Sequence, residues 1–172
     1  PLLSEQFRKF DIEKKHIHVK VIKKELMIRD KKELLKNFYE GECNRFLNIE
    51  FLTPTAFKSN GSYLILPDLK CIYQSLMNKY SASCEDMDMF DLDTLEDLVN
   101  NSSIVHYKLH STYFALEGIK IPAFKGKLSI KIQGTETMAK YARFLAEFGE
   151  YSGVGIKSAI GMGAMKVADW RK

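Results

Sequence analysis

The stretch Phe46-Leu47-Asn48-Ile49-Glu50-Phe51-Leu52-Thr53 begins the most regular part of the chain. Its inner apolar residues recur with a period of two, which is typical of a β-strand with one buried face. Pro54 is expected to end this strand, because proline cannot donate to a central ladder. A helix is expected after Pro67 and Asp68, since apolar residues follow at helical spacing. These residues are Leu69, Ile72, Tyr73, Leu76, Met77 and Tyr80.

Two more strands and a second helix complete the pattern. Residues 105–113 and 127–132 alternate in polarity and are expected to pair as a hairpin. Thr135 is expected to cap a helix that ends at Gly149, and residues 164–170 to form a last strand. The order strand, helix, strand, strand, helix, strand predicts an α+β fold, a ferredoxin-like (RRM-like) βαββαβ domain with an antiparallel sheet.

The chain is expected to have three parts. Residues 46–172 form the ferredoxin-like domain, and residues 30–45 form a connecting helix. We interpret residues 1–29 as the closing helix and strand of a truncated first ferredoxin-like domain. Residues 4–10 would be the end of that helix, and residues 15–28 would be the strand.

Charge is distributed unevenly along the chain. The net charge is +4, but residues 104–172 hold 11 Lys and Arg against 5 Asp and Glu, a local balance of +6. A basic C-terminal part favours a polyanionic partner. Residues 85–97 hold seven acids and no base, which predicts an exposed acidic insertion with a short helix capped by Asp93 and Glu96.

The composition excludes several classes of protein. Of the 172 residues, 45% are apolar and 28% charged, which is ordinary for a globular protein. No apolar run approaches the roughly 18 residues that span a bilayer, so we expect no membrane contact and a cytoplasmic protein. Cys43, Cys71 and Cys84 have no zinc-site spacing and are expected to be reduced. We expect no metal and no small-molecule cofactor.

The predicted hairpin has two chemically different faces. Tyr107 and Tyr113 alternate with the histidines and are expected to pack in the core. The other face would carry cations and hydrogen-bonding groups that can contact nucleic acid, although exposed lysines and histidines also occur simply as solvated surface. Its candidate residues are Lys108, Lys125, Lys127 and Lys131, with His106 and His110 as accessory residues.

A glycine-rich segment follows the last predicted helix. It reads Gly153-Val154-Gly155-Ile156-Lys157-Ser158-Ala159-Ile160-Gly161-Met162-Gly163. Backbone amides without side chains can form a concave anion site, and Lys157 would add a charge and Ser158 a hydroxyl beside it. The spacing fits neither a dinucleotide fingerprint nor a P-loop. We therefore expect the segment to bind a phosphate group of another kind of ligand. The alternative is that the segment is only a turn that reverses the chain direction.

This segment resembles the C-terminal signature of the CRISPR-associated endoribonucleases that cut precursor CRISPR RNA, members of the repeat-associated mysterious protein (RAMP) superfamily. The segment from Phe51 to Lys58, with Gly61 and Pro67 after it, is similar to the start of that family's second ferredoxin-like domain. The turn Phe124-Lys125-Gly126 fits the same pattern.

The resemblance implies binding of CRISPR repeat RNA and its metal-independent cleavage. The RNA 2′-hydroxyl would attack the adjacent phosphate and leave a 2′,3′-cyclic phosphate. Family members usually have two ferredoxin-like domains and a general-base histidine in the first, which is expected upstream of Pro1. The chain would then supply the RNA-binding domain and be inactive alone. The expected RNA-binding residues are Gly153, Gly155, Lys157, Ser158, Gly161 and Gly163 with the four lysines above.

Two other functions remain open at this point. The protein could be a non-catalytic CRISPR RNA-binding subunit, within an effector complex or as a homodimer. It could also be a ferredoxin-like enzyme that binds a phosphorylated small molecule. Lysines spread over two strands and a loop suit a polymer better than a metabolite.

Overall fold

The computed structural model describes residues 4–26, 28, 30–41, 43–83 and 90–168. The chain divides into two compact units, residues 1–31 and 32–172. No helix in the described ranges is long and apolar enough to cross a membrane.

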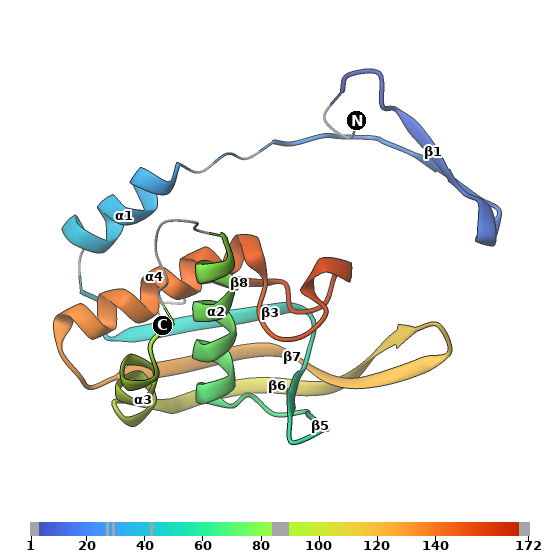
Figure 1. The fold of residues 1–172 in the computed structure, drawn as a ribbon. Coiled ribbons are helices and arrows are strands. Elements are labelled where there is room, and N and C mark those ends of the chain that lie inside the picture. The colour runs from blue at the N-terminus through green and yellow to red at the C-terminus, as the bar shows by residue number, and fades with distance from the viewer. Residues whose placement is uncertain (1–3, 27, 29, 42, 84–89, 169–172) are drawn as a thin grey trace. The chain divides into compact units, whose positions relative to one another are not determined.

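A four-stranded antiparallel sheet organises the larger unit. Its strands are β3 (Phe46–Thr55), β6 (Ser102–Leu116), β7 (Ile119–Ile132) and β8 (Met165–Val167), in the spatial order β6-β7-β3-β8. This is the strand order of a ferredoxin-like fold, and the predicted α+β class is confirmed. In Figure 1 the long β6–β7 hairpin extends beyond the rest of the sheet.

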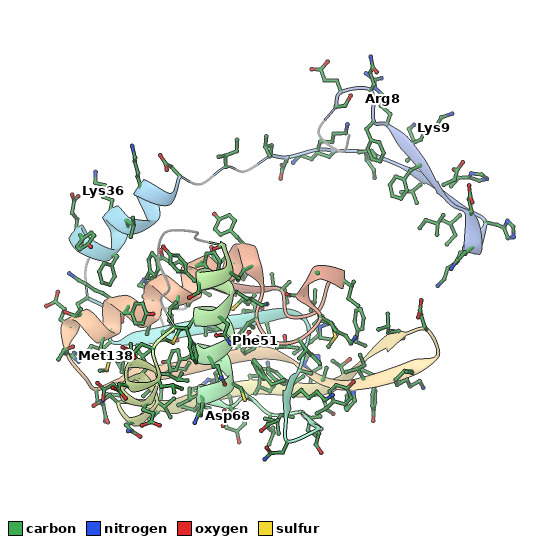
Figure 2. All side chains as sticks on the ribbon, in the orientation of Figure 1. Arg8, Lys9, Lys36, Phe51, Asp68 and Met138 are labelled. Carbon is green, nitrogen blue, oxygen red and sulfur yellow. The ribbon has the colours of Figure 1, made fainter. Side chains whose placement is uncertain are left out.

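Two helices, α2 (Leu69–Ser83) and α4 (Glu136–Ser152), cover one face of this sheet (Figure 1). Asp68 begins α2 by accepting a 2.8 Å hydrogen bond from the Cys71 amide at Oδ1, and Thr135 Oγ1 accepts one from the Met138 amide at the start of α4. Phe51 of β3 is 1% exposed and lies in the layer between sheet and helices (Figure 2). The predicted apolar stripe of α2 is buried there, apart from the half-buried Leu69.

Helix α1 (Lys31–Glu40) lies where the connecting helix was predicted. Its Phe38 packs edge to face against Phe144 of α4, with ring centroids 5.9 Å apart. The helix is therefore tied to the core of the larger unit.

The short helix predicted in the acidic segment is confirmed and its acids are exposed, but the segment is not an exposed insertion. Helix α3 (Leu92–Asn100) buries Leu95 and Leu98 completely, both at 0% exposure, so this segment is part of the core. Its cap is Asp91 and not the predicted Asp93, because the Asp91 carboxylate accepts a hydrogen bond from the Thr94 amide. The Thr94 hydroxyl also donates to this carboxylate, and the two hydrogen bonds hold the pKa of Asp91 below its usual range. Residues 84–89 lie outside the described residues.

Three predicted boundaries differ from those observed. Strand β3 continues through Pro54 to Thr55, with an irregular register against β7 at that point. A small hairpin of β4 (Phe57–Ser59) and β5 (Ser62–Leu64) follows, and the prediction had only a turn there. Helix α4 continues past Gly149, which is buried; a Cβ atom there would lie 2.8 Å from Leu76 Cδ2 and 2.9 Å from Met165 Sδ. The last strand ends at Val167, and residues 169–172 lie outside the described residues.

The predicted burial of Tyr107 and Tyr113 is also wrong. Tyr107 lies opposite Leu128 and therefore faces the helix side as expected, yet it is 66% exposed. Tyr113 is 65% exposed. Strand β6 is at the edge of the sheet, and the helices do not extend far enough to cover its tyrosines.

The N-terminal unit contains a small hairpin. Strands β1 (Lys9–Ile12) and β2 (Ile17–Lys20) pair antiparallel around the 3-10 turn η1 (Glu13–Lys15). The strand predicted over residues 15–28 is confirmed only at residues 17–20. The helix end expected at residues 4–10 is wrong, because this stretch forms a turn and the start of β1.

The burial of α3 gives a direct test of its place in the core. Replacing Leu95, which is fully buried, with Ala is expected to lower the free energy of unfolding by about 2–5 kcal/mol, through lost burial and a cavity. Leu92→Ala is the matched control on the same helix, since Leu92 is 59% exposed, and is expected to change stability by less than about 0.5 kcal/mol. Equal effects in urea denaturation would show that α3 does not pack as described.

Candidate nucleic-acid interface

The sheet register brings the predicted lysines onto one face. His106 pairs with Ser129 across β6 and β7, Lys108 with Lys127, and His110 with Lys125. On the other side of β7, Lys131 pairs with Phe46 of β3. Residues opposite one another in a ladder share a face, so all of these side chains lie on the face that α2 and α4 leave open.

This open face also carries charges that the sequence analysis did not select. Glu50 of β3 lies opposite Lys127 and forms a 3.2 Å ion pair with Lys166 of β8. Lys166 therefore belongs to the same surface. Its position could have been found by extending the alternation of Met165 and Val167, whose neighbours point to the open face.

His106 and His110 are both exposed and stand on β6, four residues apart. The strand rise separates them by about 13 Å. The structure therefore does not bring the two rings together, and a single proton could not be handled by both.

The glycine segment packs at the end of the lysine row. Met162 is buried against Ile121 and Ala123 of β7 in a second apolar cluster, and Ile156 contacts the same cluster. Ala123 and Ile121 continue the alternation of Lys125 and so lie on the open-face side of the hairpin. The segment thus adjoins the Lys125 end of the row.

Most amides in this segment are hydrogen-bonded within the protein, contrary to the expectation of an open row of donors. The Val154 amide donates to the Gly163 carbonyl, and the Gly163 amide donates to the Pro54 carbonyl. The Gly155 amide donates to Ser75 Oγ. The Ile156 amide donates to the Ala56 carbonyl. The loop is therefore fastened to α2 and to the end of β3.

Close backbone packing explains two of the glycines. A Cβ atom at Gly163 would lie 1.8 Å from the Val154 carbonyl oxygen, and one at Gly155 would lie 2.4 Å from the Ala56 carbonyl oxygen. Both residues also have positive φ. Gly161 differs, since a Cβ there meets nothing within 4 Å. The alternative of a structural turn thus accounts for Gly155 and Gly163, but the open surroundings of Gly161 leave space outside the loop.

Three consecutive amides of the loop have no acceptor within the described residues. They belong to Lys157, Ser158 and Ala159, at the 3-10 turn η2 (Ser158–Ile160). Lys157 is exposed and has a left-handed backbone, with φ of 56°. The anion site predicted for the whole segment could therefore be formed only by the amides of this short part.

The side chain of Lys79, which the sequence analysis did not select, contacts this turn. Lys79 of α2 donates to Ser158 Oγ at 2.7 Å and to the Ser152 carbonyl at 3.2 Å. The side chain is half-buried, and burial lowers the pKa of Lys79 to about 8. Lys79 lies between Leu76 and Tyr80, beside the apolar stripe of the helix. That position could have indicated from the sequence that its side chain is half-buried.

No group of three metal-ligating side chains is gathered anywhere in the described part of the chain. What the arrangement can do chemically is bind an extended polyanion. The lysine row would neutralise phosphates, and the η2 amides with Lys157 would donate hydrogen bonds to one of them.

The glycine contacts lead to a matched pair of substitutions. Gly163→Ala and Gly161→Ala both place a side chain at positive φ, which costs about 1–2 kcal/mol. Only Gly163→Ala also meets a backbone oxygen, so its total loss in free energy of unfolding should reach about 4 kcal/mol or more. Equal losses in thermal or urea unfolding would contradict the packing described for the loop.

Comparison with known proteins agrees with this fold and its signature. The chain is 44% identical over 137 residues to the CRISPR-associated endoribonuclease Cas6 of Streptococcus thermophilus, which covers 80% of this chain and 56% of that protein. It is 32% identical over 167 residues to the Mycobacterium tuberculosis protein of the same name, covering 97% and 53%. The chain thus spans about half the length of the curated relatives it matches.

Solved structures give the same fold. A Cas6 product complex superimposes with a TM-score of 0.68 at 22% identity, over 77% of this chain and 55% of that one. Thermus thermophilus Cas6 gives a TM-score of 0.66 at 21% identity, over 77% and 57%. The family model for the CRISPR-associated endoribonuclease Cas6 matches residues 49–165. Because that match covers more than half of the chain, the protein belongs to the Cas6 family of CRISPR-associated endoribonucleases.

Proposed function

We propose that the chain binds CRISPR repeat RNA and serves the maturation of precursor CRISPR RNA. The observation that carries this proposal is the row of lysines on the open face of the sheet. The η2 amides and Lys157 of the glycine segment add further donors. Cations spread along two strands and a loop can neutralise several phosphates along a strand of RNA. The relatives named as Cas6 endoribonucleases support the same substrate class.

In this proposal the residues have separate roles. Lys108, Lys125, Lys127 and Lys131 neutralise phosphates along the sheet. The Lys157, Ser158 and Ala159 amides donate to one phosphate at the loop, and Lys79 holds the Ser158 hydroxyl in place from below. Gly153, Gly155 and Gly163 act through the packing of the loop, while Gly161 leaves space for the RNA beside it.

We propose cleavage without a metal ion, by attack of the RNA 2′-hydroxyl on the adjacent phosphate to leave a 2′,3′-cyclic phosphate. Such a reaction needs a general base, a general acid and donors to the phosphate oxygens. The loop and lysines can supply only the donors. We assign the base to a histidine outside residues 1–172, and His106 and His110 to accessory contacts with RNA.

Residues 1–29 are proposed to be the tail of a first ferredoxin-like domain. Association with a CRISPR effector complex and formation of a homodimer are further proposals. A non-catalytic role in binding CRISPR RNA is the second candidate function. This role is favoured because the two histidines of the open face are four residues apart on β6. That spacing is about 13 Å along a strand, too far for both to act on one proton.

Lys79 is expected to give RNA binding a pH dependence. Its pKa of about 8 means that the ammonium is charged below that pH and neutral above it. Affinity for repeat RNA should fall from about pH 7 to about pH 9 at constant ionic strength. Lys79→Arg should remove this part of the fall, because a guanidinium stays charged throughout. Fluorescence anisotropy with labelled RNA measures both profiles.

The control for that experiment is Lys70→Arg, an exposed lysine on the same helix. It should keep the pH profile of the unmodified chain. If Lys79→Arg also kept the unmodified profile, Lys79 would have no part in RNA binding.

Catalysis is tested by comparing this chain with one extended upstream by a first domain. Both are incubated with labelled repeat RNA in EDTA, and the products are analysed for a cyclic phosphate. General acid and base groups contribute about 10²- to 10⁴-fold, so only the extended protein should cut at a measurable rate. Binding by the short chain without cleavage by either protein would favour the non-catalytic role. Robust cleavage by the short chain would place the base within it.

A further inference from the structure

A cavity of about 450 Å³ opens between α1, α3 and the start of α4. Pockets that bury small ligands usually have volumes of about 300–1,000 Å³, so this one is large enough to hold a side chain of another molecule. All the residues that line it belong to the larger unit. It is not part of the lysine row, because its lining comes from helices on the covered side of the sheet.

The apolar part of the pocket comes from three side chains, one on each helix. They are Phe38 of α1, Leu98 of α3 and Met138 of α4, and all three also belong to the core between the sheet and the helices. Figure 2 shows Met138 where the start of α4 lies next to α3. A second aromatic residue, Tyr141, completes this side of the lining. A ligand would therefore meet apolar and aromatic surface here.

The polar side of the pocket carries two carboxylates. Asp91, Thr94 and Asp97 are three residues apart and share the face of α3 that lines the pocket. The hydrogen bonds that Thr94 donates favour the ionised form of Asp91. Asp97 is exposed, and its carboxylate forms no ion pair with any described residue. No cation is found among the described lining residues, so the pocket presents two negative charges beside aromatic surface.

Two cations near the start of α4 have partners outside the pocket. Lys140 forms a 2.9 Å ion pair with Glu136, which is on the first turn of α4 and is not a lining residue. The Arg45 guanidinium donates to the carbonyls of Ile132 and Gly134. Neither cation forms an ion pair with the two carboxylates of the pocket, which can therefore bind a cation brought by another molecule.

We propose that this pocket binds an arginine side chain of a partner protein. A guanidinium group donates to carboxylates in a planar fork and stacks on aromatic rings, and it is more weakly hydrated than an ammonium group. The pocket offers both kinds of surface to it. The rim residues Asp91, Asp97 and Thr137 are exposed, so a side chain carried by another protein can enter from the solvent.

RNA does not fit this pocket. Its phosphates would be repelled by the two carboxylates, and no described lining residue could neutralise them. The lysine row lies on the opposite face of the sheet, so the pocket stays accessible while RNA is bound there. The proposal goes beyond RNA binding and does not depend on it.

An NMR titration of the full chain with a blocked arginine tests the pocket. The probe is N-acetyl-arginine methylamide, which presents the side chain as a protein would. We expect saturable shifts of the backbone amides of residues 94–98 and 137–141, with a Kd of about 1 mM at constant ionic strength. The neutral analogue N-acetyl-citrulline methylamide has nearly the same shape. It should bind at least about tenfold more weakly, because the charge-assisted hydrogen bonds to the carboxylates are lost.

Two variants remove a negative charge and keep the shape of the pocket. Asp97→Asn should weaken binding of the blocked arginine at least about fivefold. Asp91→Asn should do the same and still cap α3, because asparagine caps helices about as well as aspartate. Asp93→Asn is the matched control, since Asp93 is exposed on the same helix and is not a lining residue. It should bind the probe as the unmodified chain does.

The proposal is overturned if the blocked arginine causes no saturable shifts up to about 20 mM, where a millimolar site would be nearly filled. It is also overturned if the citrulline analogue binds equally well, or if Asp93→Asn weakens binding as much as Asp97→Asn. Displacement of the probe by repeat RNA would show that the pocket belongs to the RNA surface. Agmatine, a free small guanidinium compound, should bind within about tenfold of the probe; much tighter binding would assign the pocket to a small molecule and overturn the protein partner. The titration itself contains no RNA, so a failure of RNA binding would not affect its outcome.

Discussion

The hydrogen-bonded contact between the glycine loop and the end of β3 is the constraint on which the candidate interface depends. The Ile156 amide donates to the Ala56 carbonyl at 3.0 Å, and the Gly163 amide donates to the Pro54 carbonyl at 3.0 Å. Such contacts require the two backbones to approach without side chains between them, and the glycines make that approach feasible. Because β3 is a central strand, the loop is held by the rigid part of the domain.

This attachment determines which amides can reach a ligand. Most amides of the loop donate to acceptors on β3, on α2 or within the loop itself. The amides of residues 157–159 have no acceptor among the described residues. Lys79 supports that short turn from α2 through Ser158 Oγ. The result is a small donor group supported from α2, which is what recognition of one phosphate within a longer polyanion requires.

Strong periodic patterns in the sequence predicted most of the fold. The strand at Phe46, the helix stripe from Leu69 and the pairing of residues 105–113 with 127–132 were each set by alternation or helical spacing, and tertiary packing agreed with them. Segments whose burial depends on distant partners were predicted less well. Acidity suggested an exposed segment before Asn100, yet Leu95 and Leu98 pack on the core and decide its place. Tyr107 faces the predicted side, but it lies on the edge strand and stays 66% exposed.

The lysines of the candidate interface were selected from the sequence because they alternate along strands. Lys79 was not, because its role comes from the loop that folds back onto α2 some 80 residues later in the chain. The glycines were selected correctly as special positions, but for an incomplete reason. Gly155 and Gly163 allow close packing of two backbones, and among the four glycines of this segment Gly161 alone has nothing within 4 Å of an added Cβ.

The central claim is that the outward amides of the η2 turn bind RNA phosphate while the rest of the loop stays fastened to β3. Backbone NMR spectra of the chain, recorded with and without repeat RNA, test it most directly. The amides of Lys157, Ser158 and Ala159 should shift on binding, and those of Val154 and Gly163 should keep their positions and their protection from hydrogen exchange. Large shifts at Val154 and Gly163 with unchanged signals from residues 157–159 would contradict the account.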